Sequence, residues 1–290
     1  MQHDCRPQTN VADVDYRWLA VGISILSSLT SIDHAHAQNR PVATVETVAQ
    51  APGKVVTAQP VGQAPVIDGD VLGDAAWASV APVSGFVQNA PNEGQPATER
   101  TEVRVVFTDD TVYFGVVCYD GDPSAIIVSD SRRDSSMNDA DSFQIVLDTF
   151  SDQQNGFVFG TTPAGQEYDG QVINEGGALR SYAGAGRGGF SRGSGGGFNL
   201  NWDGVWQVRT AISDLGWSAE FAIPFSTIRY PDREVQAWGV NFQRNIRRRA
   251  ETAYWAPLPR QYNLYRVSRA GQLTGITAPA GFTGNLQVTP

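Results

Sequence analysis

Apolar and polar residues alternate over short runs along most of the chain. Between Trp217 and Ile223, most of the large apolar side chains fall at every second position, which is the period of a strand with one buried face. Pro224 ends this run because proline lacks the N–H that strand pairing needs. The same pattern predicts eight strands: Glu102–Phe107, Val112–Tyr119, Ser142–Thr149, Gly156–Thr161, Tyr168–Ile173, Trp206–Ser213, Trp217–Ile223 and Trp238–Ile246.

Helical periodicity is nearly absent from the sequence. Two short stretches, Asp74–Val80 and Phe225–Arg229, each predict one helical turn. Many short strands separated by Gly, Asp, Asn and Pro, with so little helix between them, are typical of an all-β fold. We therefore expect an antiparallel, jelly-roll-like β-sandwich over residues 65–276, a length that suffices for one domain with a sizeable core.

The first 37 residues have the pattern of a secretory signal peptide. An apolar run from Trp18 to Leu29 is too short to span a bilayer, and Ala35-His36-Ala37 has the small residues of a signal-peptidase site. The acidic residues before this run depart from the positively charged start of such peptides. Export predicts a location in the periplasm or outer membrane. Residues 38–64, rich in Ala, Val, Pro and Gln without sustained periodicity, predict a linker.

Removal of residues 1–37 would also remove all three histidines and Cys5. A chain without histidine cannot carry out Ser-His-Asp or Cys-His catalysis, and it cannot bind zinc or haem through that residue. We therefore expect neither haem nor zinc. Cys118 would remain as a single cysteine, which excludes a disulfide within the processed chain, and its place in an apolar strand predicts that it is buried.

Two stretches have a biased composition. Nine arginines lie between Arg229 and Arg269, but the chain as a whole has 30 acidic and 21 basic residues and a net charge of −9. This acidity, together with export, argues against nucleic acid as a partner. Residues 183–197 consist almost entirely of Gly, Ser and Arg. They lack the apolar residues of a packed segment and the ending of a phosphate-binding loop, so they predict a mobile loop.

Six ordered segments carry a more specific signal together than any of them alone. They are Pro65–Gly69, Asp74–Trp77, Phe107–Val116 with Asp120, Asp141–Asp148, Gly216–Tyr230 with its Ile-Pro-Phe ending, and Trp238–Asn245. In this order they resemble carbohydrate-binding module family 9, a sugar-binding β-sandwich found beside some xylanases. The resemblance covers about residues 65–276. It implies a non-catalytic module that binds a polysaccharide or glycan for a polysaccharide-degradation or envelope protein.

The resemblance also implies a partner. In many similar exported bacterial proteins, such a module is followed by an outer-membrane β-barrel, so residues 277–290 would lead into a barrel in a longer form of the protein. This leaves a structural alternative open, in which the domain docks onto or plugs the barrel from the periplasm and binds no sugar.

Sugar binding rests on aromatic faces that stack against a pyranose ring and on planar polar side chains that bond its hydroxyls. Trp202 and Trp255 are the tryptophans with the best chance of being exposed, because neither lies in a core-pattern strand position. Amides at every second position from residue 241 make a polar row on one face of the last predicted strand, although an ordinary solvated face would have the same pattern. The expected hydrogen-bonding residues are Gln144, Asn241, Gln243 and Arg247.

At three positions the chain departs from the family that it resembles. The xylanase-linked modules carry a tryptophan near the position of Asn138, an acidic residue at the position of Gln144, and an arginine near Gly160. All three would belong to one sugar-binding cleft. The departures suggest that the fold is retained while the sugar site is changed or lost, so fold and function are separate questions.

Carboxylates leave two further alternatives open. An enzyme acting on O-glycosyl bonds needs two of them across one sugar ring, and structural calcium, which the resemblance implies, needs several oxygen ligands around one point. The short loop Ser135–Asp141 offers Asn138, Asp139 and Asp141 to a calcium ion, although without a regular calcium-loop spacing. The acids available for catalysis are Asp139, Asp141, Asp148, Glu167, Asp169, Asp203 and Glu220.

Overall fold

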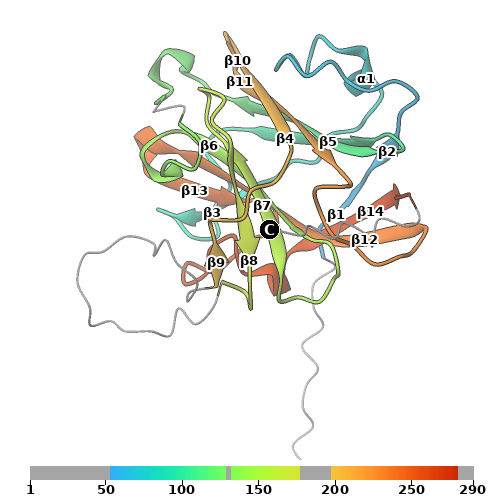
Figure 1. Ribbon diagram of the computed structural model, residues 1–290. Coiled ribbons are helices and arrows are strands. Elements are labelled where there is room, and N and C mark those ends of the chain that lie inside the picture. The colour runs from blue at the N-terminus through green and yellow to red at the C-terminus, as the bar shows by residue number, and fades with distance from the viewer. Residues whose placement is uncertain (1–52, 129–131, 177–196, 280–290) are drawn as a thin grey trace, which may run out of the picture. The chain divides into compact units, whose positions relative to one another are not determined.

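The computed structural model describes residues 53–128, 132–176 and 197–279, and these residues form two β-sheets that face each other (Figure 1). The predicted signal peptide 1–37, residues 183–196 of the predicted mobile loop, and residues 280–290 of the C-terminal segment lie outside the described residues.

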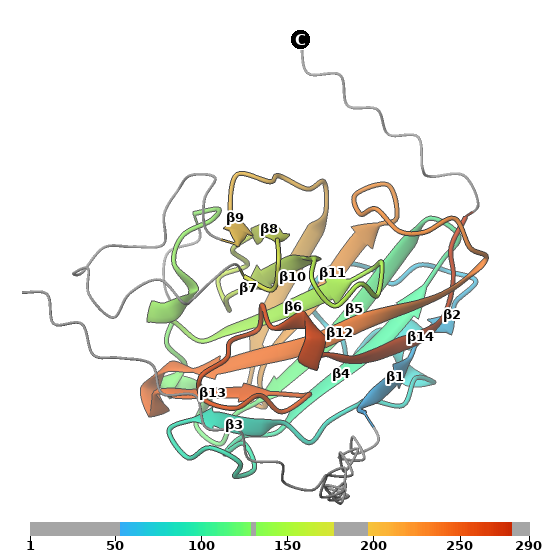
Figure 2. The same ribbon diagram turned by 90° about the horizontal axis from the view of Figure 1, so that it is seen from below.

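The large sheet has nine strands within the described residues. Its order is β1 (Val55–Thr57), β14 (Gly271–Thr277), β12 (Val235–Ile246), β6 (Ser142–Asp148), β7 (Gly156–Thr161), β8 (Tyr168–Val172) and β9 (Phe198–Asn199). The long strand β12 also pairs with β13 (Glu251–Tyr254), which in turn pairs with β3 (Val87–Ala90). Figure 2 shows β3 and β13 at one edge of this sheet and β8 and β9 at another.

In the described part of the chain, the small sheet has five strands in the order β10 (Gln207–Ser213), β11 (Gly216–Pro224), β5 (Thr111–Tyr119), β4 (Thr101–Phe107) and β2 (Gln59–Pro60). Helix α1 (Ala75–Ala78) lies on the side of this sheet that faces away from the large sheet (Figure 1). Four single turns of 3-10 helix complete the elements: η1 (Pro123–Ala125), η2 (Met137–Asp139), η3 (Arg247–Arg249) and η4 (Val267–Arg269). None of the helices in the described ranges has the length and hydropathy needed to cross a membrane.

Apolar side chains gather in three layers. The central layer fills the space between the sheets and contains Phe114, Phe143, Phe221 and Phe242. A second cluster, which includes Trp77, covers the outer face of the small sheet, and Trp77 lies directly over Gly115. A third cluster lies on the outer face of the large sheet, where the segment 255–270 folds over β6 and β7. Each sheet is therefore covered on both faces over part of its area.

The predicted fold class and all eight predicted strands are confirmed, with ends that differ by three residues or fewer. The buried position of Cys118 is confirmed as well. Two expectations need correction. The sheets are mixed rather than purely antiparallel, because β1 runs parallel to β14 and β2 runs parallel to β4. Residues 225–229 form a turn rather than a helix, in which the Thr227 N–H donates to the Pro224 carbonyl.

The predicted linker 38–64 also needs correction at its C-terminal end. Val56 and Ala58 are buried in the central layer, and β1 and β2 give each sheet one edge strand. The folded domain thus includes residues 55–60, whose pairing partners lie far along the chain.

Candidate functional site

Two of the predicted glutamines lie side by side on the outer face of the large sheet, which we define as the face turned away from the small sheet. Gln144 of β6 is the direct partner of Gln243 of β12 in the antiparallel pairing. Their strand neighbours Phe143 and Phe242 point the other way, into the central core. Alternation along the two strands therefore brings both amides to the same face.

Gln144 is 6% exposed, and its amide makes no hydrogen bond to any residue that the structure describes. Its polar atoms are not among the fully covered, unpartnered side-chain atoms of the described residues, so the end of the amide reaches the surface of this face. An unpaired amide at this depth can offer one acceptor and two donors to a ligand hydroxyl or to water. Gln144 is therefore the best candidate for a ligand contact on this face.

The positions that depart from the resembled family meet beside Gln144. Gly160 of β7 is its cross-strand partner on the other side. A Cβ atom at residue 160 would lie 2.9 Å from Cγ of Gln144 and 3.0 Å from Cε of Met137, which is buried next to Asn138. No longer side chain fits at residue 160 unless these atoms move. The chain thus fills with its own glutamine and methionine the space where the family has an arginine.

Four polar residues next to Gln144 are linked by hydrogen bonds. The Gln243 amide donates to Oδ1 of Asn245 at 3.1 Å, and the Thr252 hydroxyl donates to the same atom at 3.1 Å. The Asn245 amide in turn donates to Oγ of Ser142 at 2.9 Å. These bonds hold Gln243 and Asn245 in fixed orientations, which lowers the entropy that a ligand contact would cost.

Sequence reasoning missed an aromatic residue on the same face. Tyr168 of β8 is the partner of Gly160 and is partly exposed. Its ring stacks on Phe198 at 6.1 Å and 14°, and Phe198 stacks on Tyr265 at 4.4 Å and 5°. Phe198 lies over Gly170, where a Cβ atom would be 2.4 Å from its ring. Gly160 on β7 and Gly170 on β8 could have indicated this in the sequence. A glycine inside a strand often marks a place where a bulky side chain from a neighbour lies over the sheet.

Two predicted site residues are buried, and their expected exposure is wrong. Trp255 is 1% exposed and packs against Phe242 of the central core at 5.4 Å, so it presents no free face to a sugar. Asn241 is 1% exposed because its side chain holds the chain after β13 in place. Its amide donates to the Ala256 carbonyl at 2.9 Å, and its oxygen accepts from the Ala256 N–H at 2.8 Å.

The remaining two predicted residues are not beside Gln144. Trp202 is half-buried against Phe157 and Phe159, at 5.0 Å and 5.9 Å between ring centres. Both phenylalanines belong to the central core, so Trp202 lies on the opposite side of the large sheet from Gln144. Arg247 is exposed in η3, and its backbone N–H donates to Oδ1 of Asp141 at 2.9 Å.

The loop proposed for calcium does not have a convergent set of ligands. Asn138 and Asp139 are exposed, whereas Asp141 is fully buried and accepts from Arg247. Throughout the ranges that the structure describes, no group of three or more Asp, Glu, His or Cys side chains is arranged to hold a metal ion. The residues of this loop therefore do not fit the structural calcium that the resemblance implies.

The buried carboxylates are occupied with contacts inside the fold. Asp148 accepts from the N–H groups of Asp152 and Gln153 and so closes the turn after β6. Asp169 accepts from Arg133 and from the Gly204 N–H, each at 2.7 Å. Burial raises the pKa of Asp141, Asp148 and Glu220. These contacts give Asp148 and Asp169 structural roles, whereas Oδ2 of Asp141 is buried and has no hydrogen-bond partner among the described residues.

The fold and the polar face together define a class of protein: a β-sandwich with amides and an aromatic stack on the outer face of one sheet. No protein-family model matches the chain, and no curated protein does. Among solved structures, the chain is similar to a family 9 carbohydrate-binding module from Caldicellulosiruptor kristjanssonii in complex with cellotriose. That match has 18% identity and a TM-score of 0.50, and it covers 82% of this chain and 98% of the module.

A second similar structure is a proposed carbohydrate-binding protein from Bacteroides uniformis. It matches with 12% identity and a TM-score of 0.55, over 77% of this chain and 99% of that protein. The predicted likeness to family 9 modules is thus confirmed for the fold. At these identities the likeness carries no residue roles.

Proposed function

We propose that this domain binds a carbohydrate through the outer-face site, which we define as Gln144, Gln243, Asn245 and Tyr168. The observation that carries the proposal is the amide of Gln144 in the middle of this set: the residue is 6% exposed, its amide makes no hydrogen bond to a described residue, and the amide end still reaches the surface. The fold supports it, since one protein with this fold is a family 9 module in complex with cellotriose.

The chemistry of the site favours a neutral sugar. All four residues of the outer-face site are uncharged, and the positions where the resembled family has an acid and an arginine hold Gln144 and Gly160. The amides would bond hydroxyl groups, and the partly exposed ring of Tyr168 would contact the CH face of a pyranose. Binding here needs neither a nucleophile nor a general acid, so the proposed activity is recognition without catalysis.

Substitution of Gln144 by leucine tests this proposal. We expect Gln144→Leu to fold normally, because the leucine has a similar size and removes an unpaired polar group. We expect its affinity for the retained glycan to fall about tenfold, as for the loss of one or two neutral hydrogen bonds. The ligand is first identified by pull-down on xylan, cellulose, chitin and peptidoglycan, with calcium and with a chelator. Affinity is then measured by titration calorimetry.

The matched control is Gln207→Leu, which removes an exposed glutamine from β10 in the other sheet. It should bind as the unmodified protein does. Equal affinities for the two variants, with both folded by circular dichroism, would refute the outer-face site. A folded protein retained on none of the polysaccharides would instead favour the docking or plug alternative.

The setting that we propose for this activity is the periplasm or outer membrane, as part of an exported polysaccharide-binding protein. The support is the signal-peptide pattern of residues 1–37. N-terminal sequencing of the protein from the periplasm should give a chain that begins at Gln38.

A further inference from the structure

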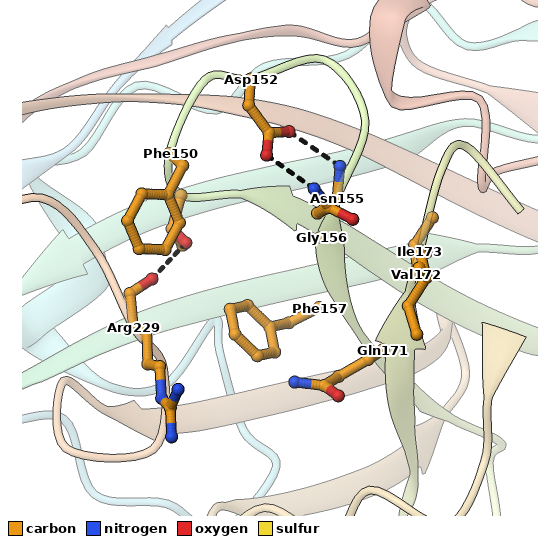
Figure 3. A pocket seen from close by; sticks show the side chains of 10 residues that line it. Phe150, Asp152, Asn155, Gly156, Phe157, Gln171, Val172, Ile173 and Arg229 are labelled. Atoms are coloured by element: carbon orange, nitrogen blue, oxygen red, sulfur yellow. Dashed lines mark hydrogen bonds between the residues drawn. The ribbon is translucent and has the colours of Figure 1, made fainter. Parts of the chain in front are cut away.

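A separate hollow, whose lining does not include Gln144, lies at one end of strands β6, β7 and β8 (Figure 3). It has a volume of about 380 Å³. The end of β6, the start of β7, the end of β8 and the turn after β11 each contribute to its wall. The lining residues used below are Phe150, Asp152, Asn155, Phe157, Gln171 and Arg229.

The hollow has an aromatic wall that is open to solvent. Phe150 is 49% exposed and makes no ring contact with any described residue. Phe157 lies deeper, belongs to the central core, and faces the hollow between Phe150 and Gln171 (Figure 3). An exposed aromatic ring beside a concave surface is unfavourable in water and favours contact with a flat apolar face of a ligand.

The polar side chains of the hollow differ in whether they already have hydrogen-bond partners. Arg229 is exposed, and its guanidinium makes no hydrogen bond or ion pair with any residue in the described ranges. The amide of Gln171 is equally without a partner there. In contrast, the Asp152 carboxylate accepts from the backbone N–H of Asn155 at 2.8 Å and from its side-chain amide at 2.7 Å. Among the residues that the structure describes, the hollow therefore presents one free cation, Arg229, and one free amide, Gln171.

The backbone around Arg229 is fixed although its side chain is free. The Thr149 hydroxyl donates to the Arg229 carbonyl, which ties the turn after β11 to the end of β6 (Figure 3). This bond fixes the backbone from which the side chain starts, and the guanidinium lies on the far side of the hollow from Asp152 (Figure 3). A free, planar guanidinium of this kind matches a carboxylate, which it can bind through two parallel hydrogen bonds.

We propose that this hollow is a second binding site, and that it takes a hexuronate, a pyranose ring that carries a carboxylate. The ring would stack on Phe150, Arg229 would pair with the carboxylate, and Gln171 would bond a ring hydroxyl. The volume lies in the lower part of the range of small-ligand sites, which suits one or two sugar rings. The site does not depend on the outer-face site, because Phe157 and Gln144 point to opposite faces of the large sheet.

The test is a titration of the protein followed by amide chemical shifts. The probes are glucuronate and galacturonate, with glucose as a neutral sugar and benzoate as a flat carboxylate without hydroxyls. We expect both uronates to shift the amides of Phe150, Gln171 and Arg229, and to bind at least tenfold more tightly than glucose or benzoate. Arg229→Gln and Phe150→Ala should each weaken uronate binding at least tenfold.

Arg260→Gln is the matched control, since Arg260 is likewise exposed and its side chain has no partner among the described residues. Uronate affinity that falls equally in Arg229→Gln and Arg260→Gln would overturn the proposal. So would benzoate or glucose binding as tightly as the uronates, or no uronate binding at all. Gln144→Leu separates the two sites: uronate binding should persist in this variant, and its loss there would assign the uronate to the outer-face site.

Discussion

At the scale of single residues, the sequence segments that resemble family 9 modules serve the fold rather than a ligand. Glu220, one of the acids available for catalysis by sequence, is fully buried on β11. One carboxylate oxygen accepts from Trp77 Nε1 at 2.7 Å, and the other accepts from the N–H groups of Asp68 and Gly69 at 2.9 Å and 2.7 Å. A single carboxylate thus ties three of the six segments together.

Replacement of Glu220 by glutamine should destabilise the domain. All three groups that face the carboxylate are donors, so a glutamine amide would bring its own N–H groups against one of them. We expect Glu220→Gln to lower the free energy of unfolding by about 1–3 kcal/mol, the cost of a buried polar group without a partner. Urea denaturation measures this change. Glu93→Gln changes an exposed residue whose side chain makes no hydrogen bond or ion pair with any described residue, and its stability should stay within about 0.5 kcal/mol of the unmodified protein.

A second buried carboxylate makes stability depend on pH. Asp120 has a fully buried side chain and forms two hydrogen bonds with Arg248, one of them 2.6 Å long. Burial by itself would raise the pKa of Asp120, but its hydrogen bonds from Arg248 and from the Asp122 N–H, with the charges of Arg248 and Arg244, outweigh burial and lower it. The ionised carboxylate therefore stabilises the folded state.

Removal of Arg248 should be costly at neutral pH and less costly in acid. Because the folded pKa of Asp120 lies below its unfolded value of about 3.9, the stabilisation is present above about pH 4 and is lost as pH falls through the folded pKa. We expect Arg248→Leu to lower the free energy of unfolding by on the order of 3 kcal/mol at pH 7. Arg249→Leu, which removes an exposed partner of Glu99, should cost less than about 1 kcal/mol. A loss for Arg248→Leu that is the same at pH 7 and pH 3 would contradict this account.

At the scale of elements, the sequence predicted those strands whose own pattern is long enough to read. The strands β1, β2, β9 and β13 have four residues or fewer, so alternation is not visible in them. Except for the hairpin of β13 with β12, their pairing partners lie far along the chain. The side chains of Thr57 and Thr274, for example, meet across 217 positions of sequence. β3 has four residues as well. β14 has seven and was missed for another reason, because Leu273 and Ile276 are its only large apolar residues.

The candidate site likewise has features that strand alternation predicts and features that it does not. Strand alternation was enough to bring Gln144 and Gln243 to one face, because a period of two residues fixes which way a side chain points. It could not reveal that the segment after β13 folds back and buries Trp255 and Asn241. Strand alternation also could not identify Tyr168 as a site residue, because its place beside Gln144 depends on its pairing with Gly160 on β7.

The segment that precedes the expected domain start should contribute to stability. Val56 and Ala58 are buried, and the Ala58 N–H donates to the Thr274 carbonyl at 2.8 Å. We expect a chain that begins at residue 65 to lose about 2–4 kcal/mol of unfolding free energy relative to one that begins at residue 53, from the exposed apolar area and the unpaired edge of β14. Thermal melts of the two chains compare them directly, and equal melting temperatures would be incompatible with this role.

At the scale of the whole molecule, the centre of the sandwich is shielded from solvent. Cys118 lies on β5 in the middle of the small sheet, 0% exposed, and burial raises the pKa of its thiol to about 11. A thiol that is both covered and protonated reacts only when the surrounding strands separate.

The reactivity of Cys118 should therefore report global unfolding. In a Cys5→Ser chain, we expect the reaction with a disulfide reagent at pH 8 to be at least about a thousand times slower in the native state than in guanidinium chloride, as the population of unfolded molecules sets the rate. Stopped-flow absorbance measures both rates. Comparable rates in the two states would mean that the sheets open locally around β5.

The arrangement of β1 against β14 has a mechanical consequence. Since the two strands are parallel, opposite pulls on the residues before Val55 and after Thr277 would slide one strand along the other. The bonds of this ladder, bracketed by Gln272 N–H to the Lys54 carbonyl and Ala58 N–H to the Thr274 carbonyl, would then carry the load together rather than one after another. Because β1 and β14 would have to be sheared apart, the domain should resist unfolding by tension. It would then stay folded, and stay bound to a ligand, while both ends of the chain are under force.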